Sequence, residues 1–118
     1  MFFLSERYLN SEGLNTNSDT IMIAEFSVVP IGAGESLSTY VAECLKIVKM
    51  SGLKYQLTPM GTILEGDFHK VMDTIGQCHL RVRSMSGRVT TMIRLDDREK
   101  HANEMIRKVK SVEEKMGS

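Results

Sequence analysis

Hydrophobic residues recur along the chain in two patterns, one typical of strands and one typical of helices. Residues 21–29 are rich in β-branched and apolar side chains, contain no glycine and stop at Pro30, which predicts a strand. Residues 88–96 alternate apolar and polar side chains, the pattern of a strand with one buried face. Both segments are therefore expected to be strands of one sheet.

Two shorter strand-like runs lie between these segments, at residues 54–59 and 62–65. Met60 and Gly61 separate the two runs, and a two-residue connection that contains glycine predicts a tight β-hairpin. We therefore expect one hairpin with its turn at Met60 and Gly61.

Three segments repeat apolar residues at the spacing of an amphipathic helix. Ser36 is expected to cap the first helix, and Gly52 is expected to end it in a left-handed conformation. Asp67 is expected to cap the second helix, which Gly87 ends. The third apolar stripe covers residues 102–116, and the opposite face of that helix carries Lys, Arg and Glu.

The order of these elements is strand, helix, strand, strand, helix, strand, followed by one more helix. This order predicts an α+β fold, a ferredoxin-like βαββαβ sandwich with an additional C-terminal helix. Right-handed crossovers place both internal helices on one face of the four-stranded antiparallel sheet. The other face carries too many apolar residues to remain in water, so we expect it, or the sheet edges, to pair with another subunit.

The first residues of the chain differ from the rest. Residues 10–20 are polar, prone to turns and without periodicity, so they cannot bury enough apolar surface to offset their ordering entropy. We expect a flexible N-terminal extension over residues 1–21 and one folded domain over residues 22–118. An alternative that the sequence leaves open is an ordered arm that packs on a neighbouring subunit.

Composition excludes several classes of protein. The 118 residues include 15 Lys plus Arg and 15 Asp plus Glu, so the formal net charge is zero. The chain therefore lacks the excess of basic residues that is typical of proteins that bind nucleic acid or an anionic membrane. No apolar run approaches the roughly 20 residues of a membrane-spanning helix. Two cysteines are too few for a disulfide scaffold, and nine methionines with no tryptophan are compatible with a cytoplasmic protein.

Four runs of residues, in their order along the chain, resemble the small thiamine-binding (YkoF-type) family. The most specific is the Pro-Met-Gly-Thr-x-x-Glu-Gly run at residues 59–66, and weaker ones lie at residues 29–36, 51–55 and 88–98. Single-domain members of this family have long been described as conserved proteins of unknown function. The resemblance extends from about Met22 to the C-terminus. It implies a ferredoxin-like fold, homo-oligomers that are commonly dimers paired into tetramers, and no known catalysis.

The resemblance also implies binding of thiamine or its hydroxymethylpyrimidine part. An aminopyrimidine needs a few fixed hydrogen-bond partners and a flat apolar wall, and a thiazolium cation favours a carboxylate or an aromatic face. Groups of these types occur on the first strand, around the hairpin and in the loop before the first helix. The candidate ligand-binding residues are Glu25, Ser27, Gly34, Ser36, Thr58, Met60, Thr62 and Glu65.

Most of these candidates also have a purely structural interpretation. Glu65 precedes the second helix, whose positive N-terminal end stabilises a carboxylate. Thr58 and Thr62 suit strands and hairpin hydrogen bonds. The loop that contains Gly34 and Ser36 either holds an anion, such as the phosphate of a phosphorylated vitamin, or forms a tight strand-to-helix turn. The sequence leaves both interpretations open.

No catalytic, metal or cofactor motif stands out. The three histidines share no metal-ligand spacing with Cys44 and Cys78, and these cysteines fall on apolar stripes that predict core positions. We therefore expect a non-enzymatic binding protein with no resident metal or cofactor, acting in vitamin salvage, buffering or transport. The alternative is a regulatory or scaffold oligomer that binds a protein partner and has a vestigial pocket. An enzyme on the same frame is a third class, which no set of residues supports.

Overall fold

The structure, a computed structural model, describes residues 21–34, 37–98 and 104–117. Nearly all of the predicted extension over residues 1–21 therefore lies outside the described residues, and so does Ser36. The elements are β1 (Ile21–Pro30), α2 (Ser38–Ser51), β2 (Lys54–Thr58), β3 (Gly61–Asp67), α3 (Phe68–Met85), β4 (Val89–Asp97) and α4 (Glu104–Lys115).

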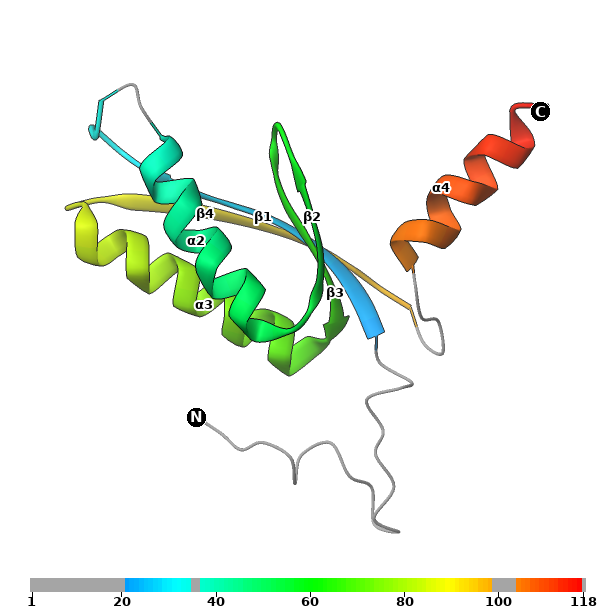
Figure 1. The fold of residues 1–118 in the computed structure, drawn as a ribbon, viewed down its shortest axis with the longest axis horizontal. Helices are drawn as coiled ribbons and strands as arrows, with labels where there is room; N and C mark the ends of the chain where they lie inside the picture. Colours follow the sequence, from blue (N-terminus) through cyan, green and yellow to red (C-terminus); the bar gives the residue numbers. More distant parts are fainter. Residues whose placement is uncertain (1–20, 35–36, 99–103, 118) are drawn as a thin grey trace, which may run out of the picture.

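The four strands form one antiparallel sheet in the order β2-β3-β1-β4. β1 therefore lies inside the sheet, between β3 and β4, and β2 lies at the edge beyond β3. α2 and α3 lie together on one face of the sheet, and α4 projects from the end at which β4 stops (Figure 1). This arrangement confirms the ferredoxin-like α+β fold with an additional C-terminal helix.

Two predicted helix boundaries have the expected capping chemistry. The Asp67 carboxylate accepts a hydrogen bond from the Lys70 backbone N–H at 3.1 Å, so it satisfies one of the free donors at the start of α3. Gly52 follows α2 with a φ of 77°, the left-handed conformation that glycine adopts without a steric cost. The predictions for Asp67 and Gly52 are confirmed.

Two other helix boundaries are displaced from their predicted positions. α2 begins at Ser38, so its N-cap is Leu37 rather than Ser36, and the Leu37 side chain makes no capping hydrogen bond. The preceding loop is rich in glycine, which restrains the entry of the chain into the helix only weakly. α3 ends at Met85, before the predicted stop at Gly87.

The hairpin turn is also one residue away from its predicted position. Gly61 pairs with Thr58 in the β2–β3 ladder, so the two residues of the turn are Pro59 and Met60. The sequence pattern placed Gly61 in the turn because glycine is common there. In the structure Gly61 is needed for another reason, since a Cβ atom at this position would lie 2.7 Å from the Phe26 carbonyl oxygen.

The core fills the layer between the sheet and the two helices. It draws apolar side chains from alternate strand positions and from one face of each helix, as the sequence pattern predicts. Its most deeply buried side chains are Met22, Leu64, Ile75, Val48, Val71, Val82 and Cys78. Cys44 is buried beside them, so the prediction that both cysteines are core residues is confirmed.

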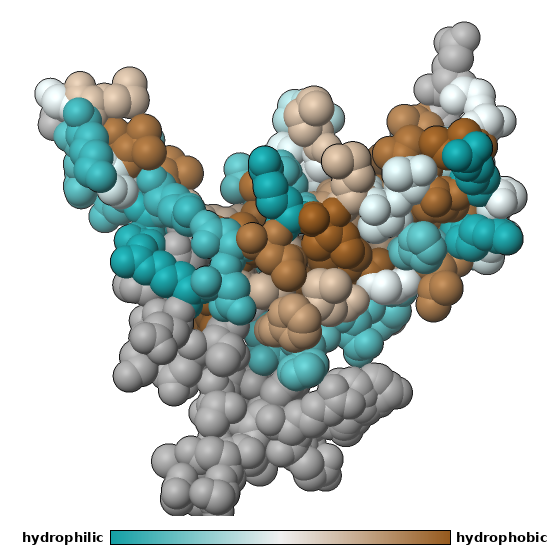
Figure 2. Space-filling model, turned by 180° about the vertical axis from the view of Figure 1, so that it is seen from behind, coloured by the Kyte–Doolittle hydropathy of each residue, from teal (hydrophilic) through white to brown (hydrophobic). Residues whose placement is uncertain are grey.

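Apolar side chains remain exposed on the face of the sheet opposite the helices and along one flank of α4 (Figure 2). On the sheet face, Val29 and Met92 are exposed. On α4, Ile106, Val109 and Val112 belong to the predicted apolar stripe, and each of them is more than half exposed. Exposed apolar side chains therefore lie on two parts of the described surface, the sheet face and α4.

Candidate functional site

A cleft of about 380 Å³ lies between the β2–β3 hairpin, the C-terminal half of β1 and the N-terminal half of α2. Phe26 and Thr62 form its buried floor and oppose each other directly in the β1–β3 ladder. Leu37, Val41 and Cys44 line the side that α2 forms. The lining is therefore largely apolar with a few polar groups, a composition typical of small-molecule sites.

Thr62 brings a hydroxyl group to this apolar floor. Its side chain is buried, at 9% exposure, and its hydroxyl makes no hydrogen bond within the described residues. A threonine hydroxyl both donates and accepts hydrogen bonds. Thr62 therefore offers a polar contact to a molecule in the cleft.

The Thr58 hydroxyl, in contrast, holds the hairpin turn together. It donates to the Gly61 carbonyl oxygen at 2.9 Å and accepts from the backbone N–H groups of Met60 and Gly61 at 3.2 and 3.1 Å. This is the hairpin hydrogen bonding of the structural interpretation. Met60 lies at the tip of the turn, is 82% exposed and borders the cleft.

Glu25 lies on the other face of the sheet from the Phe26 ring, because successive strand residues point to opposite sides. Its Oε1 accepts a hydrogen bond from the Arg94 guanidinium at 3.0 Å. This ion pair lies in a second hollow, of about 290 Å³, which Ser27, Met60 and Met92 also border. Ser27 and Met60 thus border both hollows, whereas Glu25 borders only the second.

The remaining predicted residues are not brought to the cleft. Glu65 is buried, at 4% exposure, but it is three positions from Thr62 along β3 and so lies on the opposite face. Gly34 is exposed in the loop after β1, with a φ of 92°. Ser36 lies outside the described residues, so an anion site in that loop stays a prediction.

The α2 side of the cleft was absent from the sequence-based set of site residues. Leu37 and Val41 belong to the apolar stripe of the first helix, and that stripe predicted burial in a core. In the structure both side chains remain partly exposed and line the cleft. No pattern in the sequence distinguishes a core position from a cleft position on one face of the same helix.

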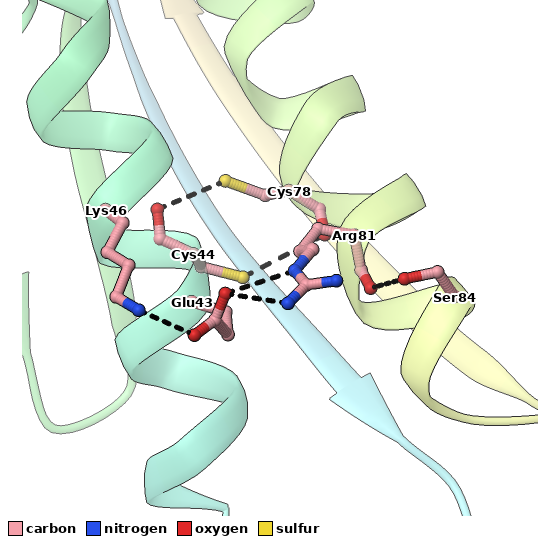
Figure 3. Close-up of polar contacts among 6 residues, drawn as sticks. All are labelled: Glu43, Cys44, Lys46, Cys78, Arg81 and Ser84. Atoms are coloured by element: carbon pink, nitrogen blue, oxygen red, sulfur yellow. Dashed lines mark hydrogen bonds and ion pairs between the residues drawn. The ribbon is translucent and has the colours of Figure 1, made fainter.

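Cys44 connects the cleft to the contact between α2 and α3. Its Sγ lies 3.9 Å from the Cys78 carbonyl oxygen, and the Cys78 Sγ lies 3.6 Å from the Cys44 carbonyl oxygen (Figure 3). The hydrogen bond from the Cys78 thiol lowers the pKa of Cys44. The contact with Cys44, together with burial, raises the pKa of Cys78. Both cysteines are free thiols.

An ion-pair cluster lies beside the cysteines and also links the two helices. The Glu43 carboxylate on α2 accepts hydrogen bonds from Lys46 at 2.9 Å and from Arg81 on α3 at 3.1 Å (Figure 3). These two cations hold the pKa of the Glu43 carboxyl below its ordinary value of 4.5. Exposed pairs of this type contribute little stability, and the buried side chains between α2 and α3 account for most of the contact between these helices.

The part of the chain that the structure describes contains neither a group of metal ligands nor a membrane-spanning helix. Within it, no three His, Cys, Asp or Glu side chains are grouped so that they could hold a metal ion. None of the helices described there has the length and apolar composition needed to cross a bilayer. The cleft, with its apolar lining and its hydroxyl group, is suited to recognising a small molecule.

The fold and the cleft define a ferredoxin-like domain of a kind found in solved structures. A hypothetical protein from Methanocaldococcus jannaschii has a crystal structure that matches with a TM-score of 0.75 and 33% identity, over 80% of this chain and 97% of that one. A putative thiamine biosynthesis/salvage protein from Thermotoga maritima has the same fold, with a TM-score of 0.59 and 21% identity, over 64% of this chain and 82% of that one.

Sequence comparison assigns the family. The family described as thiamine-binding protein matches residues 24–113. A UPF0045 protein from Methanocaldococcus jannaschii is 33% identical over 93 residues, which cover 79% of this chain and 93% of the relative. A UPF0045 protein from Staphylococcus xylosus is 41% identical over 97 residues, which cover 77% of this chain and 91% of the relative. The chain belongs to the thiamine-binding protein family, so the resemblance seen in the sequence is confirmed.

Proposed function

We propose that this protein binds thiamine, or its hydroxymethylpyrimidine part, in the cleft between α2 and the β2–β3 hairpin. It binds this ligand without catalysing a reaction and serves vitamin salvage, buffering or transport. The observation that carries the proposal is that the Pro-Met-Gly-Thr run typical of the family, residues 59–62, forms one side of the cleft. The cleft volume of about 380 Å³ also falls within the range of about 300–1,000 Å³ found for small-molecule sites.

The groups around the cleft suit a flat aminopyrimidine ring. Phe26 and Val41 supply aromatic and aliphatic surface from opposite layers. The Thr62 hydroxyl can donate to a ring nitrogen or accept from the exocyclic amino group. Met60 stands at the rim, and its flexible, polarizable side chain can cover the ring once it is bound.

The uncharged lining of the cleft favours binding of the neutral pyrimidine ring over the charged parts of the vitamin. None of the described residues that line the cleft is Asp, Glu, Lys or Arg, so neither a thiazolium nor a phosphate has an ionic partner there. Glu25 lies on the other face and is paired with Arg94. In this proposal the pyrimidine enters the cleft and the thiazolium stays at its open side. Thiamine phosphate is then expected to bind no more tightly than thiamine.

A homo-oligomer is part of the same proposal. A second copy would cover the apolar sheet face around Val29 and Met92, together with the exposed flank of α4. A dimer of dimers is the assembly that the family resemblance implies. A regulatory or scaffold oligomer with a protein partner would use the same apolar surfaces but would leave the cleft without a vitamin ligand.

Titration calorimetry and thermal denaturation with thiamine, hydroxymethylpyrimidine and thiamine phosphate test this function. A ligand that binds only the native state stabilises it by about 2.7 kcal/mol at a free concentration of 100 times its Kd. In a domain of this size that gain raises the melting temperature by roughly 10 °C or more. No heat and no shift with any of the three compounds, at about millimolar concentration, contradicts the proposal. Co-purification would then test for a protein partner.

A further inference from the structure

Cys44 and Cys78 face each other where α2 packs on α3. Each sulfur lies close to the carbonyl oxygen of the other residue, at 3.9 and 3.6 Å (Figure 3). Reciprocal contacts of this kind require the two residues to lie side by side, which a disulfide also requires, because its Cα atoms are only about 4.4–6.8 Å apart. Glu43, the residue before Cys44, also pairs with Arg81 of α3, so this part of α2 contacts α3 through a second pair of side chains.

The two thiols differ in their access to solvent. Cys44 retains 8% exposure and lines the cleft, whereas Cys78 is completely buried. A small oxidant that enters the cleft therefore meets the Cys44 sulfur first. The contact with Cys78 lowers the pKa of Cys44, while the contact with Cys44 and burial raise the pKa of Cys78, so Cys44 is the more readily deprotonated of the two.

We propose that Cys44 and Cys78 form a peroxide-responsive pair, in which Cys44 is oxidised and Cys78 then joins it in a disulfide between α2 and α3. In the first step the Cys44 sulfur attacks hydrogen peroxide, an S–O bond forms, the O–O bond breaks, and a sulfenic acid and water result. In the second step the Cys78 sulfur attacks the sulfenic sulfur, and the hydroxyl group leaves as water with the Cys78 proton. Together the two thiols lose two electrons and two protons, and one peroxide becomes two waters.

Disulfide formation would restrain one residue of the cleft wall. The Cys44 sulfur already lies against the Cys78 carbonyl on α3, and bonding to the Cys78 sulfur would fix the Cys44 side chain in that position at the edge of the cleft. A ligand in the cleft would cover Cys44 and slow its oxidation, a consequence that rests on the function proposed above. The thiol pair itself depends only on the contact between the helices.

Intact-mass measurement tests the pair directly. The reduced full chain is treated with hydrogen peroxide, quenched with catalase, unfolded and alkylated with N-ethylmaleimide. We expect a monomeric product that has lost the mass of two hydrogen atoms, carries no maleimide, and takes up two maleimides after reduction with dithiothreitol. Unmodified thiols at a peroxide concentration that oxidises the urea-unfolded chain overturn the proposal, and so does a disulfide formed only between two chains.

Two cysteine variants separate the roles. Cys78→Ala is expected to stop at a sulfenic acid on Cys44, which dimedone traps and peptide mapping locates. Cys44→Ala is expected to leave Cys78 unmodified in the folded protein, because that thiol is buried. If an alanine variant fails to fold, the corresponding valine variant, which fills the space of the sulfur, takes its place. Dimedone on Cys78 of the folded Cys44→Ala protein contradicts the assigned order.

Repeating the oxidation with saturating thiamine distinguishes this proposal from the proposed function. Slower thiol loss supports both claims. An unchanged rate, with the same intramolecular disulfide, keeps the thiol pair and contradicts the placement of the ligand against Cys44. Absence of the disulfide with and without thiamine overturns the pair and leaves the ligand proposal standing on its own titrations.

Discussion

Phe26 on β1 and Thr62 on β3 oppose each other directly in the sheet, and both side chains lie on the floor of the cleft beside α2. This pairing sets a hydroxyl group next to an aromatic ring at a fixed spacing, because the β ladder holds both backbones. A flat heterocycle can then contact the ring surface and hydrogen-bond at its edge. The sheet register therefore supplies both interactions that the proposed ligand needs.

Replacing Thr62 with Val keeps the shape of the side chain and removes its hydroxyl. We expect the affinity for thiamine to fall about 2- to 10-fold, since a hydrogen bond contributes roughly 0.5–1.5 kcal/mol. Calorimetry measures the change. Thr90→Val, at an exposed threonine of β4 outside the cleft, is the matched control and should bind normally. Unchanged binding by Thr62→Val, or equal losses in both variants, contradicts the placement of the ligand.

Gly61→Ala is expected to destabilise the protein by about 1–3 kcal/mol, because overpacked sites must shift to relieve the overlap. The added Cβ atom would lie 2.7 Å from the Phe26 carbonyl oxygen and push the hairpin away from β1. Gly76→Ala in α3 is the control, since a Cβ atom there has no neighbour within 4 Å and a helix gains up to about 1 kcal/mol from alanine. Urea denaturation should show a lower free energy of unfolding for Gly61→Ala and a higher one for Gly76→Ala. A change in the same direction for both variants would refute this packing.

Met92→Lys tests the apolar sheet face as a surface between copies of the chain. Met92 is 69% exposed within one chain, so a lysine costs the isolated subunit little, whereas it places a charge in the proposed interface. Analytical ultracentrifugation should show dissociation. Leu80→Lys, at an equally exposed apolar position on α3, is the control and should leave the assembly intact. Oligomers that survive Met92→Lys unchanged contradict this interface.

The Glu43 carboxyl gives a prediction about pH. Hydrogen bonds from Lys46 and Arg81 hold its pKa below 4.5 in the folded protein, and unfolding removes both. Its stabilising contribution is therefore present above the unfolded pKa and is lost as the pH falls through the lower folded pKa. Carboxyl NMR titration of the Arg81→Gln protein should give a higher Glu43 pKa, whereas Lys54→Gln, on β2, should leave it unchanged. An unchanged Glu43 pKa in the Arg81→Gln protein contradicts this pairing.

Most of the fold could be predicted from the sequence, because strand and helix spacing and the caps at Asp67 and Gly52 are local signals. The predicted ends of strands and helices were wrong where tertiary contacts, and not local sequence, set them. Gly61 resembles a turn residue, but the close approach of the Phe26 backbone places it in the ladder. Leu37 replaces Ser36 at the start of α2, in a loop where local capping preference does not fix the helix entry.

The candidate site was only partly predictable. The Pro-Met-Gly-Thr run led to Thr62 and Met60, which do border the cleft. Glu65 belongs to the same run, yet strand alternation turns it to the other face, a consequence that the strand predicted over residues 62–65 already carried. The α2 wall around Val41 carried no signal, because its position depends on how the helix packs across the sheet.

Methyl NMR of protein labelled with ¹³C-methyl methionine, titrated with hydroxymethylpyrimidine, tests the binding site most directly. Met60 borders the cleft, Met92 lies in the hollow on the other sheet face, and Met50 is exposed near the end of α2. Binding in the cleft predicts that the Met60 methyl signal moves and saturates while those of Met92 and Met50 stay in place. Because Met60 also borders the second hollow, a Met92 signal that moves, with or without Met60, would contradict it, and so would no movement at any of the three at saturating ligand.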